Sequence, residues 1–291
     1  QRRQRRAAGR ADRVQRPGER FLLSVQLVHG ADDRHLWAKS YEVEPRNVST
    51  LLREVARDII RQTQAQVRPQ EQARLERSRT VSMEAYDAYL RARYHLATGT
   101  QHGRTRAEEY FQQAIANEPN YAEAHAGLAR LYAHGGAFLA GGDLLARARA
   151  RESASKALAL DPGNAEAYTA LAFTKMAERD WQGAEQDFQR AIELSPNYVT
   201  AHVWYAQFLA AVGRFDVALE HADRVRQLAP LQPAALSHAA VPYLQSGRTA
   251  ETLARVQEFF DLDSGHWFGY HLLARVNLQQ GKYQEAIAAV Q

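Results

Sequence analysis

The sequence contains no cysteine, no long apolar run and no signature of common catalytic sites. Without cysteine there is no disulfide framework, thiolate zinc site or cysteine nucleophile. A membrane-spanning helix needs a run of about 18 apolar residues, and the sequence has none. The sequence also lacks four common motifs: GxxxxGK[ST], HExxH, the kinase pair HRD and DFG, and a nucleophile elbow. It therefore indicates no phosphate-binding loop, zincin, kinase or serine-hydrolase site. We therefore expect no catalytic residues, no cofactor and no metal.

What is present is a chain of 291 residues, 45% apolar and 24% charged, a composition typical of a soluble protein with a buried core. The length suggests about two globular units. The chain opens with Gln1 and lacks an apolar leader, so we expect it to be a piece of a longer protein.

Positive charge is concentrated at the amino terminus. The first 20 residues hold eight arginines against Asp12 and Glu19, a balance of +6, whereas the whole chain carries +4. Residues 1–13 are expected to form an Arg-rich disordered arm. The alternative is that this arm contacts the phosphates of nucleic acid, through Arg2, Arg3, Arg5 and Arg6. The arm has no aromatic residue for base stacking, so nucleic-acid binding is the weaker interpretation.

A period of 34 residues runs through the rest of the chain. Several residue classes share it: Gly213, Gly247 and Gly281; Pro162, Pro196 and Pro230; Ala184, Ala218, Thr252 and Ala286; and Trp181, Phe215, Thr249 and Tyr283. Each period contains two stretches with helical spacing of apolar residues, such as 165–176 and 182–194. The glycines permit a tight turn between the two helices, and the prolines end the second helix. One such hairpin cannot bury its apolar face alone, so the sequence predicts a mainly α solenoid.

The period and its residues resemble the tetratricopeptide repeat. The third repeat matches best, through Tyr168, Leu171, Ala172, Trp181, Ala184, Phe188, Ala191 and Pro196. The repeats are expected at about 84–119, 121–162, 165–196, 199–230, 233–264 and 267–291. Pro242 should interrupt the first helix of the fifth repeat, and the sixth stops inside its second helix at Gln291. We therefore expect a missing carboxyl-terminal cap.

The front of the chain predicts a small α+β unit. Residues 21–28 alternate in the manner of a strand, 35–41 form a second strand, and 48–67 place apolar residues along one helix face. This order resembles the end of a TolB-like amino-terminal domain, which we place at 14–68, followed by a linker helix at 69–83.

The combined resemblance implies a bacterial signalling or transcriptional regulator. Such proteins carry an effector in cis, such as a winged helix, a serine/threonine kinase or an adenylate cyclase. The resemblance implies that this region is a non-catalytic sensory scaffold, with regulation of an attached kinase or cyclase as the alternative. A cytoplasmic location is expected, with the periplasmic side of a single-span regulator as the other option.

The resemblance also implies a binding groove, formed by the first helices of successive repeats, for a protein or peptide partner. The corresponding positions are Glu123, Arg130, Glu166, Thr169, Phe173, Thr200, Val203, Gln207, Val241, Phe268, His271 and Arg275. The alternative is that Phe173 and Val203 only pack against neighbouring helices.

Two histidine patterns have simpler explanations than ligand binding. His29, Asp32, Asp33 and His35 are close in sequence, but a polar turn rarely supplies the convergent geometry of a metal site. His125 and His202 occupy positions where the repeat prefers a bulky aromatic residue, and we expect them to be packing residues.

Overall fold

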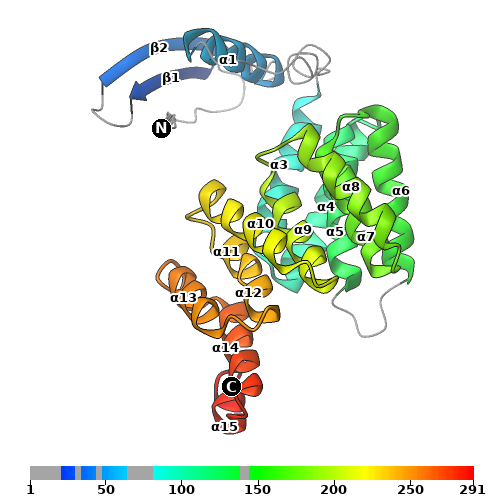
Figure 1. Cartoon of the computed structure of the whole chain (residues 1–291). Helices are drawn as coiled ribbons and strands as arrows, with labels where there is room; N and C mark the ends of the chain where they lie inside the picture. Colours follow the sequence, from blue (N-terminus) through cyan, green and yellow to red (C-terminus); the bar gives the residue numbers. More distant parts are fainter. Residues whose placement is uncertain (1–20, 30–33, 44–47, 64–80, 138–143) are drawn as a thin grey trace. The chain divides into compact units, whose positions relative to one another are not determined.

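The computed structural model describes residues 21–29, 34–43, 48–63, 81–137 and 144–291 (Figure 1). The chain divides into two compact units, residues 1–124 and 125–291. The Arg-rich arm with its four candidate phosphate contacts, the pair Asp32 and Asp33, and most of the expected linker helix lie outside the described residues.

In the first unit, strands β1 (Phe21–His29) and β2 (Arg34–Val43) form an antiparallel hairpin with an irregularity after Leu27. Helix α1 (Val48–Thr63) packs on one face of the hairpin. The core between them contains Tyr41, Leu51 and Val55. These are the elements that the alternating and helical patterns predicted.

A polar contact ties the helix to the hairpin. The Asp58 carboxylate on α1 accepts a hydrogen bond from the Tyr41 hydroxyl at 2.8 Å and pairs with the Lys39 ammonium at 2.6 Å. The hydrogen bond from Lys39 and then that from Tyr41 lower the pKa of Asp58. The ionised form of Asp58 therefore stabilises this small unit.

Helices α3 (Met83–Ala97) and α4 (Gln101–Asn117) form the first helical hairpin. Ser82 and Thr100 cap them by accepting hydrogen bonds from the backbone N–H groups of Ala85 and Gly103. Their facing sides carry small buried residues around the fully buried Phe111. Small side chains let the two backbones approach closely, and the phenylalanine fills the space that remains.

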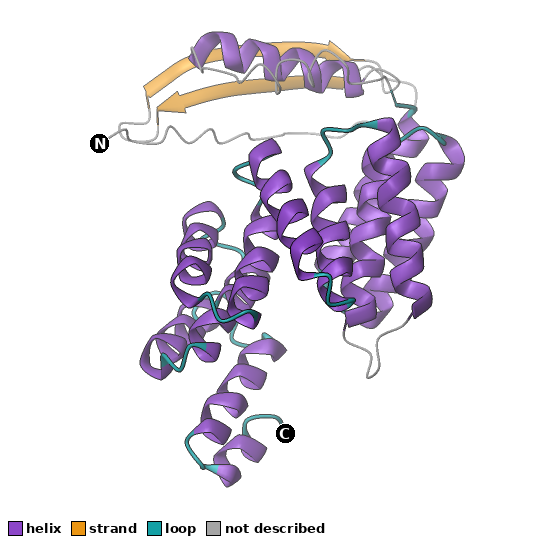
Figure 2. Cartoon of the chain, turned by 45° about the vertical axis from the view of Figure 1, so that its right-hand side comes forward, coloured by secondary structure: helices purple, strands orange, loops and turns teal. Residues whose placement is uncertain are grey.

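The second unit consists of further helical hairpins (Figures 1 and 2). Its helices are α5 (Ala122–Ala137, which begins in the first unit), α6 (Leu144–Leu160), α7 (Ala165–Ala177), α8 (Trp181–Leu194), α9 (Val199–Ala211), α10 (Phe215–Leu228), α11 (Pro233–Ala239), α12 (Val241–Gln245), α13 (Thr249–Phe260), α14 (Trp267–Gln279) and α15 (Tyr283–Ala288). The described chain is therefore mainly α, a helical solenoid preceded by a small two-stranded sheet.

The turns and breaks follow the residues that the period singled out. Gly213, Gly247 and Gly281 adopt φ values of 79°, 74° and 73° between their helices, a region that residues with a Cβ rarely occupy. Pro242 separates α11 from α12, as expected for a residue without a backbone N–H. The equivalent residues Ala184, Ala218 and Thr252 are completely buried, which allows the helices of each hairpin to touch.

Candidate partner-binding surface

In the second unit, the first helices of successive hairpins bring five rings together. We call His134, Phe173, Trp204, His238 and Phe268 the ring cluster; they come from α5, α7, α9, α11 and α14. Trp204 is central, with its centroid 4.3 Å from Phe173 and 5.8 Å from the stacked ring of His134. His238 lies 5.9 Å from His134 and 4.6 Å from Phe268. The first-helix face of this unit is thus linked by rings from α5 to α14.

The ring cluster is closed rather than open to a partner. Phe173, Trp204 and Phe268 are only 5%, 5% and 6% exposed. At these exposures, most of each ring's apolar surface contacts protein, and the contacts stabilise the stack. Of the predicted groove residues, Phe173 and Phe268 are therefore packing residues in this conformation.

Three more predicted groove residues are buried in the same way. Val203 and Val241 are 5% and 8% exposed, and Thr169 is fully buried. The Thr169 hydroxyl donates to the carbonyl of Ala165, one turn earlier in α7, at 2.7 Å. Its hydrogen-bonding capacity is used within its own helix.

Two predicted groove residues, Arg130 on α5 and Glu166 on α7, form an ion pair with each other. Arg130 Nε donates to Glu166 Oε1 at 2.5 Å, and the side chains are 20% and 12% exposed. Because the pair is mostly withdrawn from water, removing one partner would leave a costly unpaired charge. The bridge therefore joins the two helices directly.

The remaining predicted residues are more accessible. Gln207 is partly exposed, and its amide nitrogen lies 3.4 Å from both the ring Nδ1 and the backbone carbonyl of His238. Thr200 on α9 is partly exposed. Glu123, at the start of α5 in the first unit, is also partly exposed.

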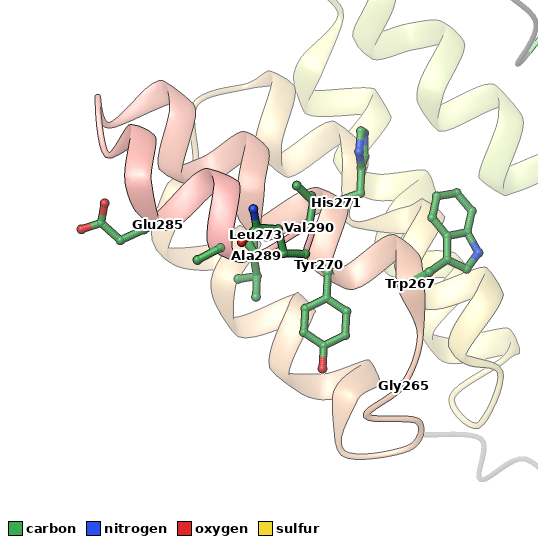
Figure 3. Close-up of a pocket in the computed structure, with 10 residues that line it drawn as sticks. Gly265, Trp267, Tyr270, His271, Leu273, Glu285, Ala289 and Val290 are labelled. Atoms are coloured by element: carbon green, nitrogen blue, oxygen red, sulfur yellow. The ribbon is translucent and has the colours of Figure 1, made fainter.

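Exposed aromatic side chains are also present at α14 and α15. An open hollow of about 840 Å³ is lined by Gly265, Trp267, Tyr270, His271, Leu273, Glu285, Ala288, Ala289, Val290 and Gln291; we call it the end hollow (Figure 3). Trp267 and Tyr270 are 59% and 41% exposed. The Tyr270 hydroxyl donates to the Ser264 carbonyl at 2.9 Å, which holds the ring at the rim.

Of the predicted groove residues, His271 lines this hollow and Arg275 lies one turn farther along α14. Burial, and secondarily the charge of Arg275, lowers the pKa of His271. At neutral pH His271 is therefore uncharged and can donate or accept a hydrogen bond. Aromatic residues and arginine are enriched at protein-binding surfaces.

A second, polar hollow of about 370 Å³ is lined by Asp223, Arg226, Gln227 and Glu258. Arg226 pairs with Glu258 at 3.0 Å and with Asp223 at 3.2 Å. Because Arg226 on α10 pairs with Glu258 on α13, the ion pairs in this hollow join the two helices.

A histidine pair that the repeat pattern does not reveal lies between α9 and α10. His202 is buried, as its packing role required, but its Nδ1 lies 2.8 Å from Nδ1 of His221. Positions one period away from His221 hold Asp187 and Arg255, so the repeat pattern indicates a surface residue there and gave no signal of the pair.

Within the described ranges, no three His, Asp or Glu side chains converge as a metal site. Nor does any helix in those same ranges have the length and apolar character needed to cross a bilayer.

Comparisons with known proteins agree with the repeat architecture. Residues 175–240 match the family model described as tetratricopeptide repeat. The structure is similar to a monomeric mutant of IFIT1 solved with Gppp-AAAA, with a TM-score of 0.59, 16% identity, and coverage of 75% of this chain and 52% of that chain. It is also similar to a thermophilic TPR protein of Thermus thermophilus, with a TM-score of 0.53, 19% identity, and coverage of 70% and 99%. The described chain therefore has the fold of tetratricopeptide repeat proteins.

One curated relative matches part of the sequence. "Putative adenylate cyclase 3" of Rhizobium meliloti (strain 1021) is 27% identical over 116 residues, which make up 40% of this chain and 20% of the relative. The match thus spans about a fifth of that protein's length.

Proposed function

We propose that this chain is a non-catalytic protein-interaction region that binds a segment of a partner protein at the exposed rings of α14, which border the end hollow. The observation that supports the proposal is the exposure of Trp267 and Tyr270 on α14, the helix that also carries His271 and Arg275. Elsewhere on the first-helix face the large rings are buried in the ring cluster. Aromatic residues and arginine contribute most of the binding energy at protein interfaces.

The partner segment would contact the two exposed rings with its apolar side chains. His271 and Arg275 would then favour a partner group that accepts hydrogen bonds, such as a carboxylate or carbonyl. The buried groove positions, including Phe173 and Val203, would support this surface without touching the partner.

The test compares photo-crosslinking from two tryptophan positions. A photoreactive phenylalanine analogue is placed at Trp267 and, in a matched control, at Trp181, which is 43% exposed on α8. Crosslinking of a host-cell protein from position 267, reduced by Tyr270→Ala and absent from position 181, supports binding at the exposed rings of α14. Equal crosslinking from both positions would overturn it.

At a finer level, we propose that the interaction region belongs to a bacterial signalling regulator and acts in the cytoplasm. A regulatory role beside an adenylate cyclase is the favoured version, because the matching relative carries that name; a serine/threonine kinase or a winged-helix regulator is the alternative. The test is cyclic AMP production by the intact gene product with and without Trp267→Ala. A changed rate supports regulation of a cyclase, and an unchanged rate in an active cyclase opposes it.

The Arg-rich arm supports a second candidate function, phosphate contact through Arg2, Arg3, Arg5 and Arg6. Neutralised phosphates release counterions, so such binding must weaken steeply with salt. Binding to duplex DNA that disappears without residues 1–20 and falls with salt supports the arm. Binding unchanged by either treatment would exclude it.

A further inference from the structure

His202 and His221 form a hydrogen-bonded pair that joins α9 to α10. Nε2 of His202 lies 2.9 Å from the carbonyl oxygen of Pro196. A carbonyl oxygen only accepts, so Nε2 of His202 carries the hydrogen and its Nδ1 must accept. Nδ1 of His221, 2.8 Å away, is then the donor. With both rings neutral, all the groups that face one another are satisfied.

The charged groups around the pair do not stabilise added protons. Arg224 on α10 disfavours a cation at His202 and is itself bonded to Asn197 at 2.8 Å. His221 packs against the Tyr205 ring at 4.8 Å. The hydroxyl of Tyr205 points to Glu185 on α8, a carboxylate already paired with Arg214 at 2.5 Å.

Protonation therefore acts on the pair in two steps. One added proton can reside on Nε2 of His221 and leave the shared hydrogen bond in place. A second proton puts a hydrogen on both facing Nδ1 atoms, and the bond becomes a repulsive contact. Burial lowers the pKa of both rings. For His221 the nearby His202 lowers it further, and the pKa is about 4.

Helix α9 carries His202 and the centre of the ring cluster, Trp204, on different sides. His202 and Trp204 are two residues apart, a rotation of about 200° around a helix. Trp204 fills the first-helix face between Phe173 and His134. Because α9 is a single continuous helix of 13 residues, a change in its contact with α10 also moves Trp204.

We propose that the α9/α10 hairpin is an acid-operated gate of the first-helix face. With the His202–His221 bond in place, α9 holds Trp204 inside the ring cluster and the face is closed. When both imidazoles carry a proton, α9 separates from α10 and the ring cluster opens to solvent. This gate is independent of the end hollow and of any partner that binds there.

The test follows the accessibility of Trp204 to acrylamide in the full chain. Trp37→Phe, Trp181→Phe and Trp267→Phe leave Trp204 as the one tryptophan. We expect the quenching constant to stay low down to about pH 4, where only the first proton is taken up, and to rise severalfold below it, while helicity at 222 nm is retained. In His202→Phe with His221→Phe, which replaces both partners by apolar rings, the constant should stay low over the same range.

Two other imidazoles near Trp204 need a control. His134 on α5 stacks on the Trp204 ring. Burial, and secondarily the charge of His266, lowers the pKa of His238 on α11 to about 4. The matched variant His238→Phe should keep the acid response of the parent. Loss of the response in that variant would assign it to His238 and overturn the proposal.

Three further outcomes would also overturn the proposal: a shielded Trp204 throughout, exposure only together with helix loss, or a paired phenylalanine variant that responds like the parent. If that variant does not fold, His221→Gln replaces it. The glutamine amide can still donate to Nδ1 of His202 but takes no proton. A flat response in His221→Gln supports the gate, and a parental response contradicts it.

Discussion

Replacing Phe188 by alanine tests the packing between adjacent repeats most sharply. The Phe188 ring on α8 is fully buried, and it lies 5.4 Å from the Tyr205 ring and 5.7 Å from the Phe208 ring, both on α9. Truncation removes the ring from both contacts and leaves a cavity that two flanking helices can only partly fill.

The expected loss in the free energy of unfolding is about 3–5 kcal/mol, the range for a buried phenylalanine. In a repeat array this loss falls on one interface between neighbours, so unfolding should begin at α8/α9. The assay is urea unfolding followed by circular dichroism, together with hydrogen exchange of the α8 and α9 amides.

The matched control is Tyr283→Ala, because Tyr283 is 66% exposed on α15. It should change the unfolding free energy by less than about 0.5 kcal/mol, as exposed sites usually do. A loss below about 1 kcal/mol for Phe188→Ala, or equal losses for the two variants, would refute the packing described here.

Three further predictions follow from single contacts. Gly213→Ala should destabilise the folded chain by about 1 kcal/mol, measured by urea unfolding. An alanine at φ 79° is strained even though its Cβ would meet no neighbour. An unchanged or higher stability would contradict this strain. Glu166→Gln should lower the free energy of unfolding by about 2 kcal/mol, because Arg130 is left without its charged partner. Exchanging the two residues, Arg130→Glu with Glu166→Arg, should recover part of that loss. No recovery would show that the bridge adds little stability. The pKa of Asp58 is lowered in the folded state, so the stabilisation by Asp58 is present above its unfolded pKa and is lost as the pH falls through its folded pKa. NMR signals of Trp37 should therefore report acid loosening of the α1–hairpin contact. Asp58→Asn should remove this pH dependence, and an unaltered profile in that variant would exclude Asp58 as its source.

Much of the architecture is predictable because the 34-residue period describes contacts within one hairpin. Gly213 and Pro242 have local backbone effects, so the turn and the helix break could be placed from residue type alone. The complete burial of Ala184 also follows from its place in the period. The alternating residues of β1 predicted the strand for the same reason, since side chains of a strand point to opposite faces.

Contacts between hairpins were not predictable in this way. The 5.9 Å contact of His134 with His238 joins the second repeat to the fifth, and it depends on how far each hairpin rotates relative to the previous one. A small rotation per repeat accumulates along the solenoid, and the period contains no measure of it. Phe173 therefore matched a groove position in the pattern but is buried under Trp204 in the structure.

The His202–His221 pair was missed for a different reason. The repeat pattern specifies the size of a side chain at position 202, and a histidine satisfies it by volume. It does not specify the hydrogen-bond partner of the imidazole, which comes from a variable position on α10. Polar pairs of this kind require the structure.

The most direct test of the account compares two tryptophans at neutral pH. The central claim is that the first-helix face of residues 125–291 is closed around Trp204, whereas Trp267 at the end hollow is accessible. Single-tryptophan chains that keep either Trp204 or Trp267 are titrated with acrylamide, and their emission maxima are recorded. We predict blue-shifted, weakly quenched emission from Trp204 and red-shifted emission from Trp267 with a quenching constant several times larger. Equal quenching of the two, or stronger quenching of Trp204, would contradict it.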